Sequence, residues 1–145
     1  MAQREKAEEE LRRLSMELRY LEQTADALQQ RISMVNAALT DINYANMTLD
    51  GMEKEKENSE MLIPIGGSSY VKVKLADTNK VIIGLGSGVS VEKTLPEAKT
   101  ILKERLDELE KTMHAAQQQY SQVAERMNSG RSRLESMLST REGKQ

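Results

Sequence analysis

The stretch LRRLSMELRYLEQTADALQQRISMVNAALTDI, residues 11–42, repeats apolar or small side chains at alternate spacings of three and four. A stripe held at a period of 3.5 residues over about five heptads is the signature of a coiled coil. A second run of the same kind begins at Leu102 and continues to Met137. These runs flank one short segment of different character, so the sequence predicts two long helices joined by an insert.

The composition agrees with a protein that is mostly helix surface. The chain has no Phe, Trp or Cys, and 30% of its residues are charged, which argues against a thick globular core and excludes disulfides and thiolate metal sites. The net charge of −2 with mixed signs favours neither a nucleic-acid nor a membrane partner. No apolar run approaches the roughly 18 residues that span a bilayer, and the start is too charged for a signal peptide. We expect a cytoplasmic protein without a cofactor.

The insert changes the hydrophobic period from 3.5 to two. Val71, Val73 and Leu75 alternate with polar residues or Tyr70, as in a half-buried strand. Turn signals stand at Gly66-Gly67, at Asp77-Thr78-Asn79 and at Gly86-Ser87-Gly88. Pro64 cannot donate to a strand ladder, so the first strand is expected at an edge. The expected strands are residues 61–65, 69–76, 80–85 and 89–92.

We expect one domain over residues 1–145, with helix one in 1–57, two β-hairpins in 58–94, and helix two with a tail in 95–145. Thr94 and Glu97 have the spacing of a capping box, so helix two should begin there and run to about Thr140. Within it, Asn128-Ser129-Gly130 brings poor helix formers together and predicts a bend or fraying.

The charges beside the two seams favour an antiparallel pair. A parallel self-dimer of helix one would oppose Glu17 and Glu22, whereas antiparallel packing lets Glu17 meet Arg133 and Glu22 meet Arg131. Exposed pairs contribute only about 0.2 to 1 kcal/mol each, so they cannot define the register. Matching large residues with small ones does suggest a register, in which Leu18 lies beside Gly130.

The strands need a cover, because a few short strands without a helix over them do not stabilise themselves. Strand pairing with other chains is one completion. A small self-contained sheet folded onto the base of the coiled coil is the alternative. The residues expected to form the apolar oligomerisation face are Ile63, Ile65, Val71, Val73, Val81, Ile83, Val89 and Val91.

The insert sequences MLIPIGGSSYV, residues 61–71, and KVIIGLGSGVSVEK, residues 80–93, resemble the archaeal-type prefoldin family, and two hairpins rather than one mark its alpha type. The resemblance implies a hexamer of two alpha-type and four beta-type subunits, whose hairpins join into intersubunit β-barrels. It also implies that coiled-coil arms hold non-native polypeptides and pass them, without nucleotide, to a double-ring group II chaperonin.

The resemblance includes no motif that assigns binding residues at the ends of the arms, so we predict them from the chemistry that binding requires. Holding many unfolded chains requires exposed, adaptable apolar surface, a role that methionine suits. Met16 and Leu138 lie off the seam, whereas the seam residues have the alternative role of joining the two helices. The expected residues for binding unfolded protein are Met1, Leu11, Leu14, Met16, Met127, Leu134, Met137 and Leu138.

Other classes of function find less support, and we identify no catalytic residue. Gly84-Leu85-Gly86-Ser87-Gly88 lacks the glycine spacing and the following helix of a phosphate loop, so turn glycines are the better interpretation. His114 is the sole histidine and is expected to be a solvated helix residue rather than a metal ligand or base. A structural coiled-coil protein that forms filaments through its strand edges remains the alternative function.

Overall fold

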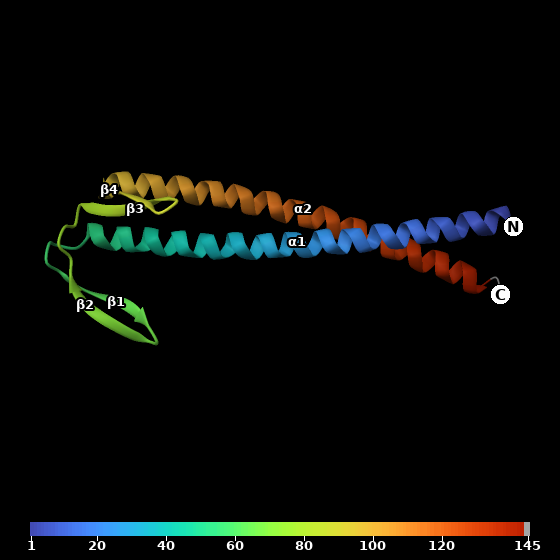
Figure 1. Cartoon of the computed structure of the whole chain (residues 1–145), viewed down its shortest axis with the longest axis horizontal. Coiled ribbons are helices and arrows are strands. Elements are labelled where there is room, and N and C mark those ends of the chain that lie inside the picture. Colours follow the sequence, from blue (N-terminus) through green and yellow to red (C-terminus); the bar gives the residue numbers. More distant parts are fainter. Residues whose placement is uncertain (144–145) are drawn as a thin grey trace. The chain divides into compact units, whose positions relative to one another are not determined.

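The computed structural model describes residues 1–143, and their order is a helix, two hairpins and a second helix (Figure 1). This confirms the predicted class, mainly α with a small β part. The contacts divide the chain into two units, Met1–Ala37 with the chain from Lys111 onward, and Ala38–Glu110. The elements are α1 (Ala2–Glu53), β1 (Glu60–Gly66), β2 (Ser69–Lys74), β3 (Lys80–Gly86), β4 (Val89–Thr94) and α2 (Leu95–Gly143).

Helix α1 ends at Glu53, before the predicted end near Glu57. The backbone of Asn58 has a positive φ of 66°, a conformation that asparagine tolerates better than most residues. The Asn58 N–H donates to the Leu75 carbonyl at 2.7 Å, and the Leu75 N–H donates to the Ser59 carbonyl at 2.9 Å. These hydrogen bonds draw the chain into strand pairing and explain why the charged run after Glu53 does not extend the helix.

Helix α2 begins with the predicted capping box. The Glu97 N–H donates to the Thr94 hydroxyl, and the Thr94 N–H donates to the Glu97 carboxylate, both at 3.3 Å. Two N–H groups that would lack partners at a helix start are thereby satisfied. The helix then continues through Gly130 to Gly143, slightly beyond the predicted end.

The two hairpins are separate two-stranded antiparallel sheets with equivalent registers. Ile63 pairs with Val71 in the first, and Ile83 pairs with Val91 in the second. Each hairpin shifts register just before its turn, at Gly66 and at Gly86, which have the same φ of 102°. Both residues of each two-residue turn have positive φ, as type I′ turns require. The insert therefore contains the same hairpin twice.

The second hairpin packs against the adjoining helix ends. Ile83 is 4% exposed and lies in a core made with both helices. The Arg105 guanidinium also donates to the Gly84 carbonyl at 2.7 Å. The expectation that no helix covers the strands is therefore wrong for β3, because the ends of α1 and α2 present apolar side chains to it. The buried members of this core, which we call the base core, are Leu49, Met52, Ile83, Leu95, Ala98 and Leu102.

A lysine links the two helices beside the base core. The Lys99 ammonium lies 2.6 Å from a Glu53 carboxylate oxygen and 2.9 Å from one of Asp50. Hydrogen bonds with Glu53 and Asp50 raise the pKa of Lys99 above its ordinary 10.5. Because the protonated lysine is favoured in the folded chain, its stabilising effect is complete below pH 10.5 and is lost as the pH rises through the raised pKa.

Lys99→Met is therefore expected to lower the free energy of unfolding at pH 8, and the difference from the parent chain should shrink above the raised pKa. Urea denaturation at several pH values measures this. Lys103→Met is the control, because Lys103 is exposed and forms none of the described ion pairs in residues 1–143. A difference that persists unchanged at high pH would show that Lys99 acts through packing and not through its charge.

Candidate functional site

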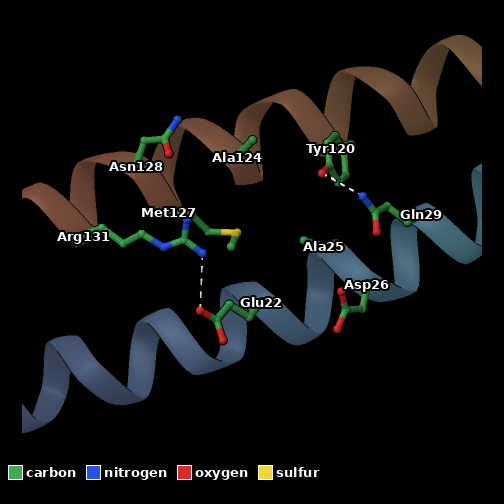
Figure 2. A pocket seen from close by; sticks show the side chains of 9 residues that line it. All are labelled: Glu22, Ala25, Asp26, Gln29, Tyr120, Ala124, Met127, Asn128 and Arg131. Atoms are coloured by element: carbon green, nitrogen blue, oxygen red, sulfur yellow. Dashed lines mark hydrogen bonds and ion pairs between the residues drawn. The ribbon is translucent and has the colours of Figure 1, made fainter.

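The helix pair within Met1–Ala37 and the chain from Lys111 onward is antiparallel, as predicted. Side-chain contacts join successively later residues of α1 to successively earlier residues of α2, which is possible only for opposite directions. Figure 2 shows two of these contacts as dashed lines. The contacts, in order along α1, are Glu8–Arg141, Glu10–Arg133, Glu22–Arg131 and Gln29–Tyr120.

One of the two predicted ion pairs is present. The Arg131 guanidinium lies 3.5 Å from the Glu22 carboxylate, but Arg133 bonds Glu10 instead of the predicted Glu17. Glu10 and Glu17 are one heptad apart and so occupy equivalent positions on the helix. The charge pattern alone could not distinguish them, and only the packed helices decide which one the arginine reaches.

The predicted contact between Leu18 and Gly130 is present. A Cβ atom added at Gly130 would lie 2.7 Å from Leu18 Cδ2 and 3.3 Å from its Cγ, and Leu18 is itself only 7% exposed. The absence of a side chain at Gly130 lets the two helices approach closely here. This glycine therefore has a packing role that its poor helix propensity did not reveal.

The seam between the helices opens toward their free ends. Leu18, Leu21 and Ala25 are buried, whereas the predicted binding residues Leu11 and Leu14 are only half-buried. Their counterparts on α2, Met127, Leu134 and Met137, are half-buried as well. The apolar side chains of this end are therefore incompletely covered by the helix pair.

Outside the seam, several large apolar side chains are exposed to solvent. Met16 is 66% exposed and Leu138 is 41% exposed, in agreement with their predicted positions off the seam. Met1 is exposed at the start of the chain. Two further side chains that were not predicted, Tyr20 and Met34, are 68% and 74% exposed. Their signal was present in the sequence, since each stands two residues after a seam position.

A pocket of about 470 Å³ lies between the helices (Figure 2). Small side chains on both helices, Ala25 and Ala124, leave room for it. The Glu22–Arg131 pair closes one end and the hydrogen bond from Gln29 to the Tyr120 hydroxyl closes the other. Polar groups lie at the ends of the pocket, and Ala25, Ala124 and Met127 lie between them. Periodicity did not predict it, because alanine counts as an ordinary seam residue.

The first hairpin presents the exposed apolar face. Ile63, Ile65 and Val71 are 46%, 65% and 42% exposed, while Val73 is half-buried. All four belong to the predicted oligomerisation face. Strands β1 and β2 form hydrogen bonds with each other, and most of their side chains are exposed to solvent. An exposed apolar strand face of this kind is a feature that interaction surfaces commonly have.

The other four predicted oligomerisation residues lie in the second hairpin and differ in their exposure to solvent. Val89 is 54% exposed, and Val91 is half-buried. Val81 is half-buried against the base core, and Ile83 is buried in it. The proposal that Ile83 faces a partner is therefore corrected, because its side chain already packs against helices of its own chain.

The residues considered for catalysis lie in a turn and on an exposed helix surface. Gly84–Gly88 forms the end of β3 and the turn to β4, as the interpretation of turn glycines predicted. His114 is an exposed side chain on α2. Among residues 1–143, no group of three or more His, Cys, Asp or Glu side chains is arranged to hold a metal ion. No helix in this part of the chain is long and apolar enough to cross a membrane.

Comparison with known proteins identifies chains of similar sequence. A family profile described as "Prefoldin subunit" matches residues 21–138. The chain is 33% identical to the prefoldin subunit alpha of Pyrococcus horikoshii, over 88% of this chain and 84% of that protein. It is 30% identical to the prefoldin subunit alpha of Methanococcoides burtonii, over 86% of this chain and 91% of that protein.

Two solved structures share the fold at lower sequence identity. The filamentous PFD of Methanocaldococcus jannaschii, determined by cryo-EM, aligns with a TM-score of 0.65 at 19% identity, covering 77% of this chain and 93% of that one. The prefoldin beta subunit of Thermococcus strain KS-1 aligns with a TM-score of 0.59 at 18% identity, covering 88% and 90%. These likenesses support the observed arrangement of two long helices and a short strand-rich insert.

Proposed function

The chain belongs to the prefoldin family, and on that premise we propose that it is the alpha-type subunit of an ATP-independent chaperone that holds unfolded proteins. Two features support the alpha type: the relatives named prefoldin subunit alpha and the presence of two hairpins. Prefoldins are chaperones and not enzymes, which agrees with a chain in which we assign no catalytic residue. A cytoplasmic location stays a prediction.

The observation that carries this proposal is the opening of the apolar seam at the free end of the helix pair. Met16 and Leu138 are exposed there, although neither is needed to join the helices. Leu11, Leu14, Leu134 and Met137 are half-buried beside them and can serve both the helix pair and a client. We assign Met1 and Met127 to the same surface.

The chemistry of this surface suits weak and unselective binding. Methionine and leucine offer apolar contact, and the unbranched thioether of methionine adapts to many shapes. A fully buried side chain of this size contributes about 1.5 to 3 kcal/mol, and a transient contact contributes less. One arm therefore holds a client weakly, and several arms in one complex increase the overall affinity through multivalency.

Assembly places several such arms together. We propose that the exposed face of the first hairpin pairs with beta-type subunits and completes a β-barrel, giving a hexamer of two alpha-type and four beta-type chains. The exposed Ile63, Ile65 and Val71 support this. From the family resemblance we further propose that the client is delivered to a group II chaperonin.

The double variant Met16→Ser/Leu138→Ser tests client binding. It is expected to reduce suppression of aggregation of an unfolding model protein, with capture weakened roughly fivefold for about 1 kcal/mol lost per arm. The hexamer should remain intact, because both side chains lie off the seam. Aggregation is followed by light scattering, with the chain assembled with its beta-type partner.

Tyr44→Ser/Met47→Ser is the matched control, since these side chains are 67% and 68% exposed on the part of α1 near the base core. It should leave capture unchanged. An unchanged curve for Met16→Ser/Leu138→Ser, together with lost activity in the control, would move the client site toward the base. An open-ended distribution of solution masses would favour the filament-forming alternative over the closed hexamer.

A further inference from the structure

The sulfur atoms of this chain are all thioethers, because it has nine methionines and no cysteine. The exposure of these side chains to solvent differs widely. Met16 and Met47 on α1 are 66% and 68% exposed, whereas Met52 in the base core is 9% exposed. A solute that reacts with thioethers therefore reaches Met16, on the surface proposed for client binding, far more readily than it reaches Met52.

Met127 offers a second accessible thioether on the client surface, although its side chain is half-buried. It lines the pocket of about 470 Å³ between the helices. That volume is far above the roughly 10 to 15 Å³ that one water molecule requires. Figure 2 shows the Met127 sulfur in the space between the two helices. Small polar solutes can therefore reach this sulfur through the pocket.

We propose that Met16 and Met127 are sites of reversible oxidation by a hydroperoxide, and that this modification weakens client capture. The inference rests on the proposed function and adds a way in which that function can be regulated. The thioether sulfur attacks one peroxide oxygen, and the O–O bond breaks as an S–O bond forms. The sulfur loses two electrons and becomes a sulfoxide. With hydrogen peroxide, the proton of the transferred oxygen passes to the departing hydroxide, so that water is the other product.

Oxidation changes the client surface without requiring a change in the fold. A sulfoxide is polar, whereas the thioether offers adaptable apolar contact. An apolar client segment that covers the sulfoxide oxygen removes it from water and offers no hydrogen bond in return, which is unfavourable. In the free chain the same oxygen stays hydrated, because Met16 is exposed and Met127 borders the pocket. The expected effect is therefore weaker capture by an intact helix pair.

The reverse reaction restores the client surface. Two thiols reduce one sulfoxide to the thioether and water, and their sulfur atoms join in a disulfide. Methionine sulfoxide reductases catalyse this step, with one enzyme for each sulfoxide epimer. Because the chain has no cysteine, neither the peroxide nor the thiol forms or breaks a disulfide within it. Loss and recovery of capture can therefore be followed at the methionines of this chain.

Met16→Leu/Met127→Leu tests the proposal, because leucine keeps a similar apolar volume and cannot be oxidised. Met47→Leu is the matched control, since Met47 is as exposed as Met16 but lies on the part of α1 near the base core. Each chain is assembled with its beta-type partner, treated with hydrogen peroxide, and compared with its own untreated sample in suppression of aggregation. Mass spectrometry measures the sulfoxide at each methionine, and Met52 should oxidise more slowly than Met16 and Met47. Methionines of the partner are common to all the complexes, so their oxidation cancels in the comparison.

Peroxide is expected to weaken capture about fivefold in the parent and in Met47→Leu, and by less than about twofold in Met16→Leu/Met127→Leu. The solution mass of the complexes should not change, and a thiol with both reductases should restore capture by the parent. An equal loss in the parent and in Met16→Leu/Met127→Leu would overturn the proposal, as would full capture by a parent chain that carries both sulfoxides. Absence of capture in the untreated parent would instead contradict the proposed function, so the two failures are distinguishable.

Discussion

Ile63→Lys is expected to break the assembly into smaller species while the helices of the chain stay folded, whereas Ile83→Lys is expected to unfold the base core. Both isoleucines occupy the same place in equivalent hairpins, opposite Val71 and Val91. Ile63 is 46% exposed, so a lysine there keeps its ammonium in water and disturbs only the face offered to a partner. Ile83 is 4% exposed, so a lysine there buries a charge without a partner.

The cost of the Ile83 variant follows from its surroundings. Removing a buried isoleucine typically costs about 2 to 5 kcal/mol, and the desolvated ammonium adds to that. Hydrogen exchange should therefore rise in Leu49 and Leu102, which pack in the same core. Substitution at Ile63 should leave that exchange unchanged.

Solution mass and circular dichroism measure the two outcomes. Leu62→Lys is the matched control for Ile63→Lys, because Leu62 is 61% exposed on the opposite face of β1. It should leave the hexamer intact. A hexamer that remains intact in the Ile63→Lys variant would show that the first hairpin is not part of the subunit interface. Normal stability of Ile83→Lys would show that the second hairpin does not need the base core.

Gly130→Leu is expected to destabilise the antiparallel helix pair by about 1 to 3 kcal/mol, the usual range for overpacking. A Cβ atom at this position would already lie 2.7 Å from the buried Leu18 side chain. Adding Leu18→Ala should restore part of the loss, because the large and small residues of the contact are then exchanged. Urea denaturation of the parent, both single variants and the double variant gives the coupling energy.

Gly51→Leu is the control for the general effect of replacing a helical glycine. A Cβ atom at Gly51 meets nothing within 4 Å, so the substitution should be neutral or stabilise by up to about 1 kcal/mol. The same gain at Gly130, with no coupling to Leu18, would contradict the packing role. It would leave the predicted bend at Asn128-Ser129-Gly130 as the reason for a glycine there.

The local structure of this protein could be predicted because short-range interactions determine it. The period of 3.5 in residues 11–42 predicted a long paired helix, and the Thr94–Glu97 spacing predicted the capping box that the structure contains. The turn residues at Gly66 and Gly86 likewise predicted the two hairpins. Each depends on residues a few positions apart, whose identities are sufficient to favour one backbone conformation.

Which side chains are buried, and which charged residues pair, was decided only by the tertiary structure. Ile63 and Ile83 have the same residue type and the same register, yet one faces solvent and the other lies in the base core, because the ends of α1 and α2 present apolar side chains to Ile83. Arg133 reaches Glu10 and not Glu17 for a similar reason, since heptad positions repeat and only the packed register distinguishes them. Burial and ion pairing depend on neighbours far away in the chain, and a repeating pattern offers several equivalent neighbours among which only three-dimensional packing selects.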